Sequence, residues 1–222
     1  MKAYIRWEHG VKYERTRQLF GDDFEKLQDA KILLLGVGGV GSVALDCLYR
    51  TGITNITIVD FDTYDESNMN RQLWSELHVN EVKVEALKQH YPEITAISQK
   101  VDREWIATFD FEPYDIILDA IDDIHAKLAL AQRCYKKLIS ATGSAKKLDP
   151  TQVRVDSVWR TQGDPFASKI RRELKRRKFD RNYRCVFSAE TARTKEKGSF
   201  MGVTAAFGLA LSAEAIKRLL KE

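Results

Sequence analysis

Short apolar runs alternate with amphipathic segments along the first two thirds of the chain. The apolar runs have the length of strands, and the segments between them space their apolar residues three and four positions apart, as helices do. This alternation predicts a mainly parallel sheet with helices on both faces. We expect strands at Lys31–Leu35, Asn55–Val59, Ala96–Val101, Asp115–Leu118 and Leu138–Ala141, and helices at Tyr13–Gln28, Val40–Arg50, Val82–Tyr91 and Ala126–Lys136.

The pattern changes after Lys147, where Asp149 and Pro150 mark a turn. Beyond the turn, Val153, Val155 and Val158 predict an added antiparallel strand, followed by a basic helix at Phe166–Lys178, a strand at Cys185–Phe187 and a closing helix at Val203–Leu220. No linker rich in proline, glycine or serine interrupts the chain. We therefore predict one domain over residues 1–222, with a Rossmann-like, doubly wound α/β core at 1–147 and an antiparallel C-terminal extension at 148–222.

Composition narrows the class of protein only a little. The 222 residues are 44% hydrophobic and 31% charged, which is ordinary for a globular protein. The three cysteines, Cys47, Cys134 and Cys185, form no CxxC pair, which argues against a structural zinc site. Their odd number, and a polar and aromatic first ten residues unlike a signal peptide, predict a cytoplasmic protein. The apolar stretch Phe200–Leu211 is too short to cross a bilayer, so we expect no membrane span.

Basic residues are concentrated between Ser168 and Arg184, where nine lysines and arginines stand against two acids. The whole chain has a formal net charge of only +4, so the rest of it is net acidic. This asymmetry indicates a polyanionic partner, although a solvated helix face would carry the same charges. As contacts for such a partner we select Lys169, Arg171, Arg172, Lys175, Arg176 and Arg177.

A glycine-rich loop, Gly36-Val37-Gly38-Gly39-Val40-Gly41, joins the first strand to the helix after it. In such a loop the first glycine allows a tight turn, the second lets the backbone approach a phosphate, and the last lets helix and strand pack closely. The free N–H groups of the helix then face the anion. Asp60 ends the second strand at the distance where a carboxylate can accept hydrogen bonds from ribose hydroxyls. These features predict a nucleotide site, but they do not separate NAD from ATP.

The segment from Asp62 to Gln72 favours ATP. A dehydrogenase has no chemical use for its asparagine, arginine and glutamine, whereas an enzyme that adenylates a carboxylate must hold a triphosphate and withdraw charge as pyrophosphate leaves. Arg71 can clamp phosphate with two hydrogen bonds, and Asn68 can donate to a phosphate oxygen. Lys83, at the start of the next helix, can supply a point charge.

Two further carboxylates follow the strand Asp115–Leu118. Asp122 lies just past the carboxyl end of this central strand, where open α/β sheets place their ligands. We expect it to contact the nucleotide or a magnesium ion bridging ATP, with water completing the coordination. We expect Asp123 instead to cap the helix that begins near Ala126.

With these residues in place, the stretch from Tyr13 to Gly143 resembles the ThiF/MoeB and ubiquitin-activating superfamily of adenylating enzymes. The resemblance rests on Gly36–Gly41, Asp60, Ser67–Gln72, Lys83 and Asp119–Asp122. It implies that Asp60 binds ribose, that the phosphates are bound by Asn68, Arg71 and Lys83, and that Asp122 binds magnesium. Arg17 resembles an arginine that reaches the nucleotide of the neighbouring subunit in a homodimer. The implied nucleotide contacts are Gly36, Gly38, Gly39, Gly41, Asp60, Asp62, Asn68, Arg71, Gln72 and Lys83, and the implied catalytic residues are Arg17, Arg71, Lys83 and Asp122.

The second half narrows the resemblance. Many members of the superfamily carry two zinc-binding CxxC pairs, which this chain lacks. Its segments Ala141–Ala145, Leu148–Val153, Gly163–Ala167 and Cys185–Glu190 instead resemble the tRNA threonylcarbamoyladenosine dehydratase branch. That likeness implies ATP- and Mg²⁺-dependent cyclisation of threonylcarbamoyl-adenosine in tRNA through an acyl-adenylate, with sulfur-transfer proteins as candidate partners. The same likeness implies that the basic helix at Phe166–Lys178 binds the tRNA.

Two rival functions remain open from the sequence. One is an adenylating activator of a small ubiquitin-like or sulfur-carrier protein, and the other is a nucleotide sensor or NAD-binding module without catalytic activity. We interpret Cys185 as a small buried strand residue rather than a thioester-forming nucleophile, because free cysteine is among the most buried residue types.

Overall fold

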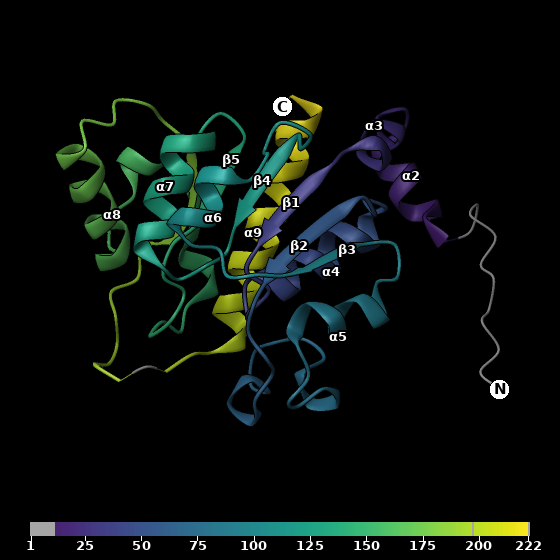
Figure 1. The fold of residues 1–222 in the computed structure, drawn as a ribbon, viewed down its shortest axis with the longest axis horizontal. Coiled ribbons are helices and arrows are strands. Elements are labelled where there is room, and N and C mark those ends of the chain that lie inside the picture. Colours follow the sequence, from purple (N-terminus) through teal and green to yellow (C-terminus); the bar gives the residue numbers. More distant parts are fainter. Residues whose placement is uncertain (1–11, 197, 222) are drawn as a thin grey trace.

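The computed structural model describes residues 12–196 and 198–221, so the first ten residues, with their predicted lack of a signal peptide, lie outside it. It contains a seven-stranded sheet in the order β3-β2-β1-β4-β5-β7-β6 (Figure 1). All neighbouring strands are parallel except β6 and β7, which are antiparallel. The predicted α/β fold class, with its antiparallel C-terminal extension, is confirmed. The strands are β1 Ile32–Leu35, β2 Ile56–Asp60, β3 Thr95–Ser98, β4 Ile116–Asp119, β5 Leu138–Ala141, β6 Val153–Ser157 and β7 Arg184–Ser188.

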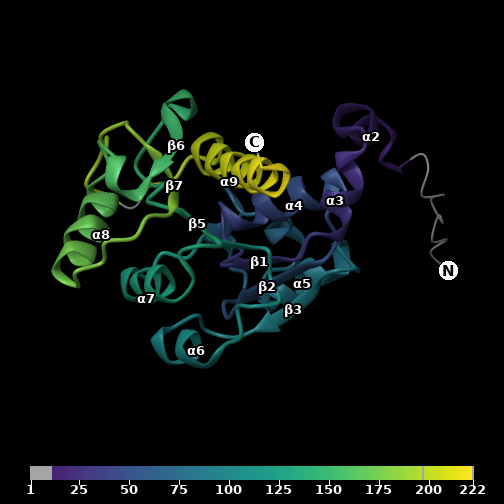
Figure 2. The same ribbon diagram turned by 90° about the horizontal axis from the view of Figure 1, so that it is seen from above.

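Helices cover both faces of the sheet because alternate strand residues point to opposite sides. Ile32 and Leu34 of β1 belong to one apolar core, whereas Leu33 and Leu35 belong to the other. Figure 2 shows α4 and α9 on one side of the sheet and α6 and α7 on the other. The helices are α2 Glu14–Phe20, α3 Asp23–Asp29, α4 Gly41–Thr51, α5 Lys83–His90, α6 Arg103–Thr108, α7 Ile124–Cys134, α8 Pro165–Arg176 and α9 Met201–Leu220.

Several details differ from the prediction. The helix expected at Tyr13–Gln28 is two helices, α2 and α3, because Gly21 has φ 55° and ψ −130°, a conformation open to glycine and unfavourable for other residues. Val158 begins a short 3₁₀ helix, Val158–Arg160, and so does not extend β6. The sequence also did not predict α6, whose six residues are too few to show a helical period.

Close packing around the glycine loop sets the position of α4. A Cβ atom on Gly41 would overlap the carbonyl oxygen of Gly36, which itself has φ 85°. A Cβ atom on Gly208 of α9 would clash with the backbone of Val40. The N-terminus of α4 is therefore held against the end of β1 by glycines on both sides.

The closing helix α9 buries one side against the core. Val203, Phe207 and Leu211 are fully buried, whereas Leu209 on the opposite side is 51% exposed. Within residues 12–196 and 198–221, no helix combines the length and hydropathy needed to cross a bilayer.

Candidate functional site

A cavity of about 980 Å³ opens at the carboxyl edge of the sheet. Its walls come from the segments that follow β1, β2, β3 and β4, together with the glycine loop. Open α/β sheets bind their ligands at this edge, where the strand order reverses. Except for Gly41 and Arg17, all the residues predicted to contact the nucleotide line this cavity.

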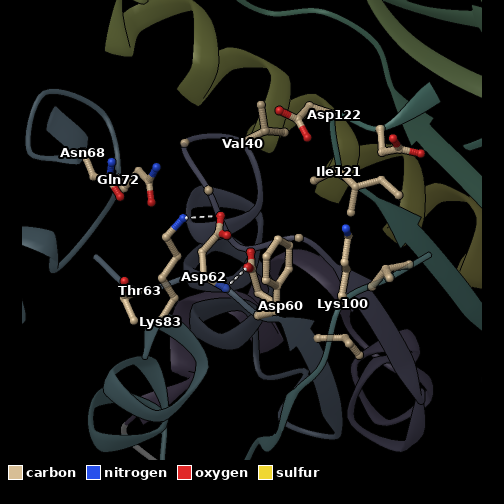
Figure 3. A pocket seen from close by; sticks show the side chains of 18 of the residues that line it. Val40, Asp60, Asp62, Thr63, Asn68, Gln72, Lys83, Lys100, Ile121 and Asp122 are labelled. Atoms are coloured by element: carbon tan, nitrogen blue, oxygen red, sulfur yellow. Dashed lines mark hydrogen bonds and ion pairs between the residues drawn. The ribbon is translucent and has the colours of Figure 1, made fainter. Parts of the chain in front are cut away.

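Asp60 holds the glycine loop in place. The backbone N–H of Val37 donates to its Oδ2 at 2.8 Å, and the N–H of Asp62 donates to its Oδ1 at 3.0 Å. Its side chain lies at the bottom of the cavity (Figure 3) and the residue is 9% exposed. A carboxylate oxygen has more than one lone pair, so a ribose hydroxyl could still donate to Asp60. The ribose contact stays a prediction.

Asn68 and Gln72 carry buried oxygen atoms that have no hydrogen-bond partner within residues 12–196 and 198–221. They are Asn68 Oδ1 and Gln72 Oε1, in side chains that line the cavity next to each other (Figure 3). An unsatisfied buried acceptor costs about 1–3 kcal/mol, so it marks a place where a donor is missing. Gln72 also lies over Gly38, where a Cβ atom would be 3.9 Å from Gln72 Nε2 and otherwise in open space. This corner of the cavity is shaped for a polar ligand close to the backbone.

Two cations reach the same cavity. Lys83 is only 5% exposed, and its Nζ donates to Asp62 Oδ2 at 3.1 Å. Arg71 Nη1 donates to the carbonyl oxygen of Ser67 and to Asn70 Oδ1, both at 2.7 Å. These contacts hold both positive charges beside the glycine loop, as binding of an anionic ligand requires.

Asp123 caps a helix, as the sequence predicts, whereas the ligand contact expected of Asp122 stays a prediction. Asp123 Oδ1 accepts the N–H of Ala126 at 2.7 Å and caps α7. Asp122 is exposed on the cavity wall, and its carboxylate accepts no hydrogen bond from the described residues. Its carboxylate is therefore free for a ligand or a metal ion.

A buried ion pair lies behind that wall. Lys127 Nζ donates to Asp119 Oδ1 at 2.8 Å and to the carbonyl oxygen of Ala141 at 2.7 Å. Both ionic side chains are 1% exposed or less. Removing one partner of such a pair costs about 3–5 kcal/mol, because the other charge stays buried alone. The pair ties the end of β4 to the end of β5, and no pattern in the sequence predicted it.

Further cavity residues, not predicted from the sequence, follow β3. Lys100 and Arg103 line the cavity, and Lys100 Nζ lies 5.7 Å from the ring centroid of the half-exposed Phe61. The expected strand ran to Val101, whereas β3 ends at Ser98. Because these residues follow the strand, the rule that ligands lie beyond strand ends would have found them.

Arg17 does not line the cavity of its own chain. It is exposed in α2, with its guanidinium carbon 4.5 Å from the ring centroid of Phe24. Its expected role, in the nucleotide site of a neighbouring subunit, stays a prediction.

The basic helix α8 begins beside the cavity. Asp164 caps it by accepting the N–H groups of Phe166 and Ala167, and it also accepts the hydroxyl of Thr142, just beyond β5. Among the six selected basic residues, Arg171 and Arg177 are only partly exposed. Arg171 donates to Thr161 Oγ1 and Arg177 to Gln132 Oε1, so both serve the fold as well. The other four are exposed, namely Lys169, Arg172, Lys175 and Arg176, and Arg176 pairs with Glu173.

Cys185 is fully buried, and burial raises the pKa of its thiol to about 12. Because the nucleophile is the thiolate, we expect iodoacetamide at pH 8 to leave Cys185 unmodified in the folded protein. Cys134, whose pKa is also raised to about 12 by burial, provides an internal control that should behave in the same way. Peptide mass spectrometry before and after unfolding in urea would measure this. Rapid alkylation of Cys185 in the folded state would contradict the interpretation of this residue as inert.

Comparisons with known proteins agree with this geometry. A family model described as "ThiF family" matches residues 13–222. The chain is 34% identical over 197 residues to the tRNA threonylcarbamoyladenosine dehydratase of Escherichia coli strain K12, covering 81% of this chain and 74% of that protein. A crystal structure of the E. coli enzyme in complex with ATP superimposes with a TM-score of 0.88 at 32% identity, covering 96% of this chain and 95% of the other. For the complex with AMP the TM-score is 0.90 at 31% identity, covering 99% and 98%.

Proposed function

The chain belongs to the ThiF family, as its motifs predict, and on this premise we propose that it is an ATP-dependent tRNA threonylcarbamoyladenosine dehydratase. The observation that carries the proposal is the pair of unpartnered buried oxygens on Asn68 and Gln72, beside the glycine loop and two cations. The hydroxyl or amino groups of a bound nucleotide could donate to these oxygens, and its phosphates would bring negative charge to the two cations. Two relatives that match 81% of this chain carry this enzyme name.

In the proposed reaction, the threonyl carboxylate of the modified base attacks the α-phosphorus of ATP. An acyl–phosphate bond forms, pyrophosphate leaves, and the product is an acyl-adenylate. The neighbouring carbamoyl group then attacks the activated carbonyl, loses a proton and expels AMP, so the nucleoside loses one water overall. Arg71 and Lys83 stabilise the charge that moves onto the departing phosphates. The second nucleophile belongs to the substrate, so no covalent bond to the enzyme is needed.

Asp122 would hold the magnesium ion that accompanies ATP. Magnesium usually keeps several waters and binds one or two carboxylates together with substrate phosphates. Asp122 fits this description because its carboxylate is free in the cavity. Among the described residues, no group of three or more histidine, cysteine, aspartate or glutamate side chains could hold a metal alone. When bound, the ion would neutralise charge on the phosphates.

The proposal is tested by incubating the purified protein with ATP, magnesium and tRNA that carries threonylcarbamoyladenosine. We expect pyrophosphate release and a nucleoside lighter by one water in mass spectrometry. ATP–pyrophosphate exchange that depends on the C-terminus of a small protein, with the tRNA inert, would instead support an activator of a ubiquitin-like protein. Binding of NAD in preference to ATP would contradict both of these functions.

Salt dependence tests the role of α8 in binding the tRNA. Changing Arg172 and Lys175 to glutamate removes two exposed cations, so the slope of log K against log salt should fall by about 1 for each lost phosphate contact. Fluorescence anisotropy with labelled tRNA at several salt concentrations would measure the slope. The control is Lys88→Glu, which changes an exposed lysine on α5. Lys88 does not line the nucleotide cavity and is not part of α8. If the α8 variant binds tRNA with the affinity and salt dependence of the wild type, α8 is not the tRNA-binding surface.

The enzyme is further proposed to be a cytoplasmic homodimer with sulfur-transfer proteins as partners. Leu209 on α9 is 51% exposed and Leu19 on α2 is 76% exposed, so both helices present apolar side chains that a second subunit could cover. The three described cysteines are free thiols, as in a reducing compartment. Sedimentation equilibrium should give twice the chain mass, and Leu209→Arg should give the monomer. A wild-type protein that stays monomeric at high concentration would contradict the dimer.

A further inference from the structure

A second cavity, of about 940 Å³, opens at the opposite edge of the sheet. It lies where β7 begins at Arg184 and where α7 and α9 end, so it is separated from the nucleotide site by the length of the strands. Figure 1 shows the C-terminal end of α9 at this edge. The charged residues that line it are Lys136, Arg184, Glu214, Lys217, Arg218 and Lys221.

Most of the positive charge in this cavity is not neutralised. Arg184 pairs with Glu214, its Nε lying 2.6 Å from Glu214 Oε1. The other four cations, those of Lys136, Lys217, Arg218 and Lys221, have no carboxylate of the described residues within 4.0 Å. Four unpaired cations in one concave surface create a positive potential that attracts anions.

Arg218 is the most enclosed of these four. It is partly buried, and its Nη1 donates to the carbonyl oxygen of Leu138 at 3.4 Å. Burial lowers the pKa of its guanidinium, and the nearby negative charge of Glu214 offsets this only in part. An anion in the cavity would supply the missing partner.

The ends of helices α7 and α9 account for only part of this charge. A helix C-terminus carries about half a negative charge, which a cation in its last turn can compensate. Lys217 and Arg218 lie in the last turn of α9, but Lys136 and Lys221 lie beyond their helix ends. The C-terminal ends of α7 and α9 together carry about one negative charge, which is less than the charge of the four cations. Most of the positive charge is therefore available to a ligand.

The exposed basic face of α8 leads to this cavity. The helix has 12 residues and therefore spans about 18 Å, starting beside the nucleotide cavity at Asp164. The segment after it carries the exposed Lys178 and Arg181 and then brings Asn182 and Arg184 into the second cavity. Because β7 is parallel to β5, Arg184 must lie at the amino edge of the sheet. Positive charge thus continues from one edge of the sheet to the other.

We propose that the second cavity binds backbone phosphates of the tRNA substrate, away from the nucleotide that reacts. This inference rests on the proposed function, and it adds a docking site that positions the RNA without reading its bases. A polyanion is favoured over a free phosphate ion because the cavity is continuous with the cationic face of α8. Contacts of this kind supply affinity and salt dependence, not chemistry.

The test uses Lys136→Glu/Lys217→Glu, which changes two exposed lysines on different elements, and Lys88→Glu as the control. Lys88 lies in the last turn of α5 and lines neither cavity. Its change to glutamate therefore reproduces the effect of reversing a charge at a helix C-terminus without changing either cavity. Anisotropy with purified tRNA carrying threonylcarbamoyladenosine, from about 50 to 200 mM KCl, should show binding weakened at least about tenfold and a slope reduced by about 2. Lys88→Glu should match the wild type. ATP affinity, measured by calorimetry without tRNA, should be equal in all three proteins.

The outcomes separate this inference from the proposed function. If the wild type binds and converts tRNA but the double variant binds it equally well, the second docking site is refuted and the enzyme activity stands. If the wild type neither binds tRNA nor cleaves ATP, the proposed function itself is wrong, and the docking site that rests on it is wrong as well. Inorganic phosphate at constant ionic strength is the remaining probe. Calorimetric binding of phosphate that the double variant loses, with tRNA affinity unchanged, would assign the cavity to a free anion and overturn the inference.

Discussion

Replacing Arg71 with alanine is expected to lower the rate of pyrophosphate release about 10³-fold, because a preorganised cation that meets developing phosphate charge contributes on that order. The guanidinium is held in place by Ser67 and Asn70, and its side chain packs on Gly39, where a Cβ atom would lie 3.1 Å from Arg71 Cγ. Arg71→Lys should recover only part of the rate, since lysine keeps the charge but cannot form two parallel hydrogen bonds. Single-turnover assays with saturating ATP and tRNA would measure both variants.

The control for this experiment is Arg133→Ala, an exposed arginine on α7 that lines neither cavity. It should unfold at the same temperature as Arg71→Ala and release pyrophosphate at the wild-type rate. Near-normal activity of a folded Arg71→Ala protein would contradict the assigned role. A loss of folding in Arg71→Ala would be visible in thermal unfolding, and Arg71→Lys would then carry the test.

Gly41→Ala is expected to destabilise the protein by more than about 3 kcal/mol, at the upper end of overpacking effects. The added Cβ atom would overlap the backbone oxygen of Gly36, and backbone atoms cannot move aside as a flexible side chain can. Gly38→Ala makes the same chemical change three positions earlier, where the nearest atom is 3.9 Å away. The second variant should therefore fold normally and lose affinity for ATP, because its methyl group projects into the space meant for phosphate.

Urea unfolding and ATP calorimetry on the two variants together would test the assignment of the loop. The expected pattern is one variant that loses stability and one that loses only nucleotide binding. If Gly38→Ala binds ATP as well as the wild type does, the phosphates do not lie over this part of the loop. A stable Gly41→Ala protein would mean that α4 can move away from β1.

The sequence predicted the elements of the core closely because their signals are local. The strand Leu138–Ala141 coincides with β5, and the expected helix Val40–Arg50 differs from α4 by one residue at each end. A strand or helix that buries one face must repeat its apolar residues at the matching period. A short stretch of sequence is therefore enough to predict such an element. The glycine loop, Asp60 and Asp122 were readable for the same reason, since each lies within a few residues of a strand end.

The sequence alone could not predict features that depend on groups far apart in the chain. Lys127 pairs with Asp119 and the backbone of Ala141 beneath the site, and no local pattern separates that lysine from a solvated one. The break at Gly21 was missed because apolar spacing on either side of it continues across the glycine. Asp60 was predicted for its ligand, but whether its oxygens also hold Val37 depends on how β1 and β2 pair.

Sequence by itself determined the class of fold, the glycine loop and the chemical types of the residues that line the nucleotide site. Only the tertiary structure decided which polar atoms lack partners there, and which cations of the chain meet at the opposite edge of the sheet. Lys136, just beyond the end of α7, and Lys217, in the last turn of α9, are far apart in the sequence, and they line one cavity because the two helices end at the same edge. The periodic pattern of apolar residues indicates which face of a helix or strand is buried. Which other elements pack against that face depends on the packing of the whole chain.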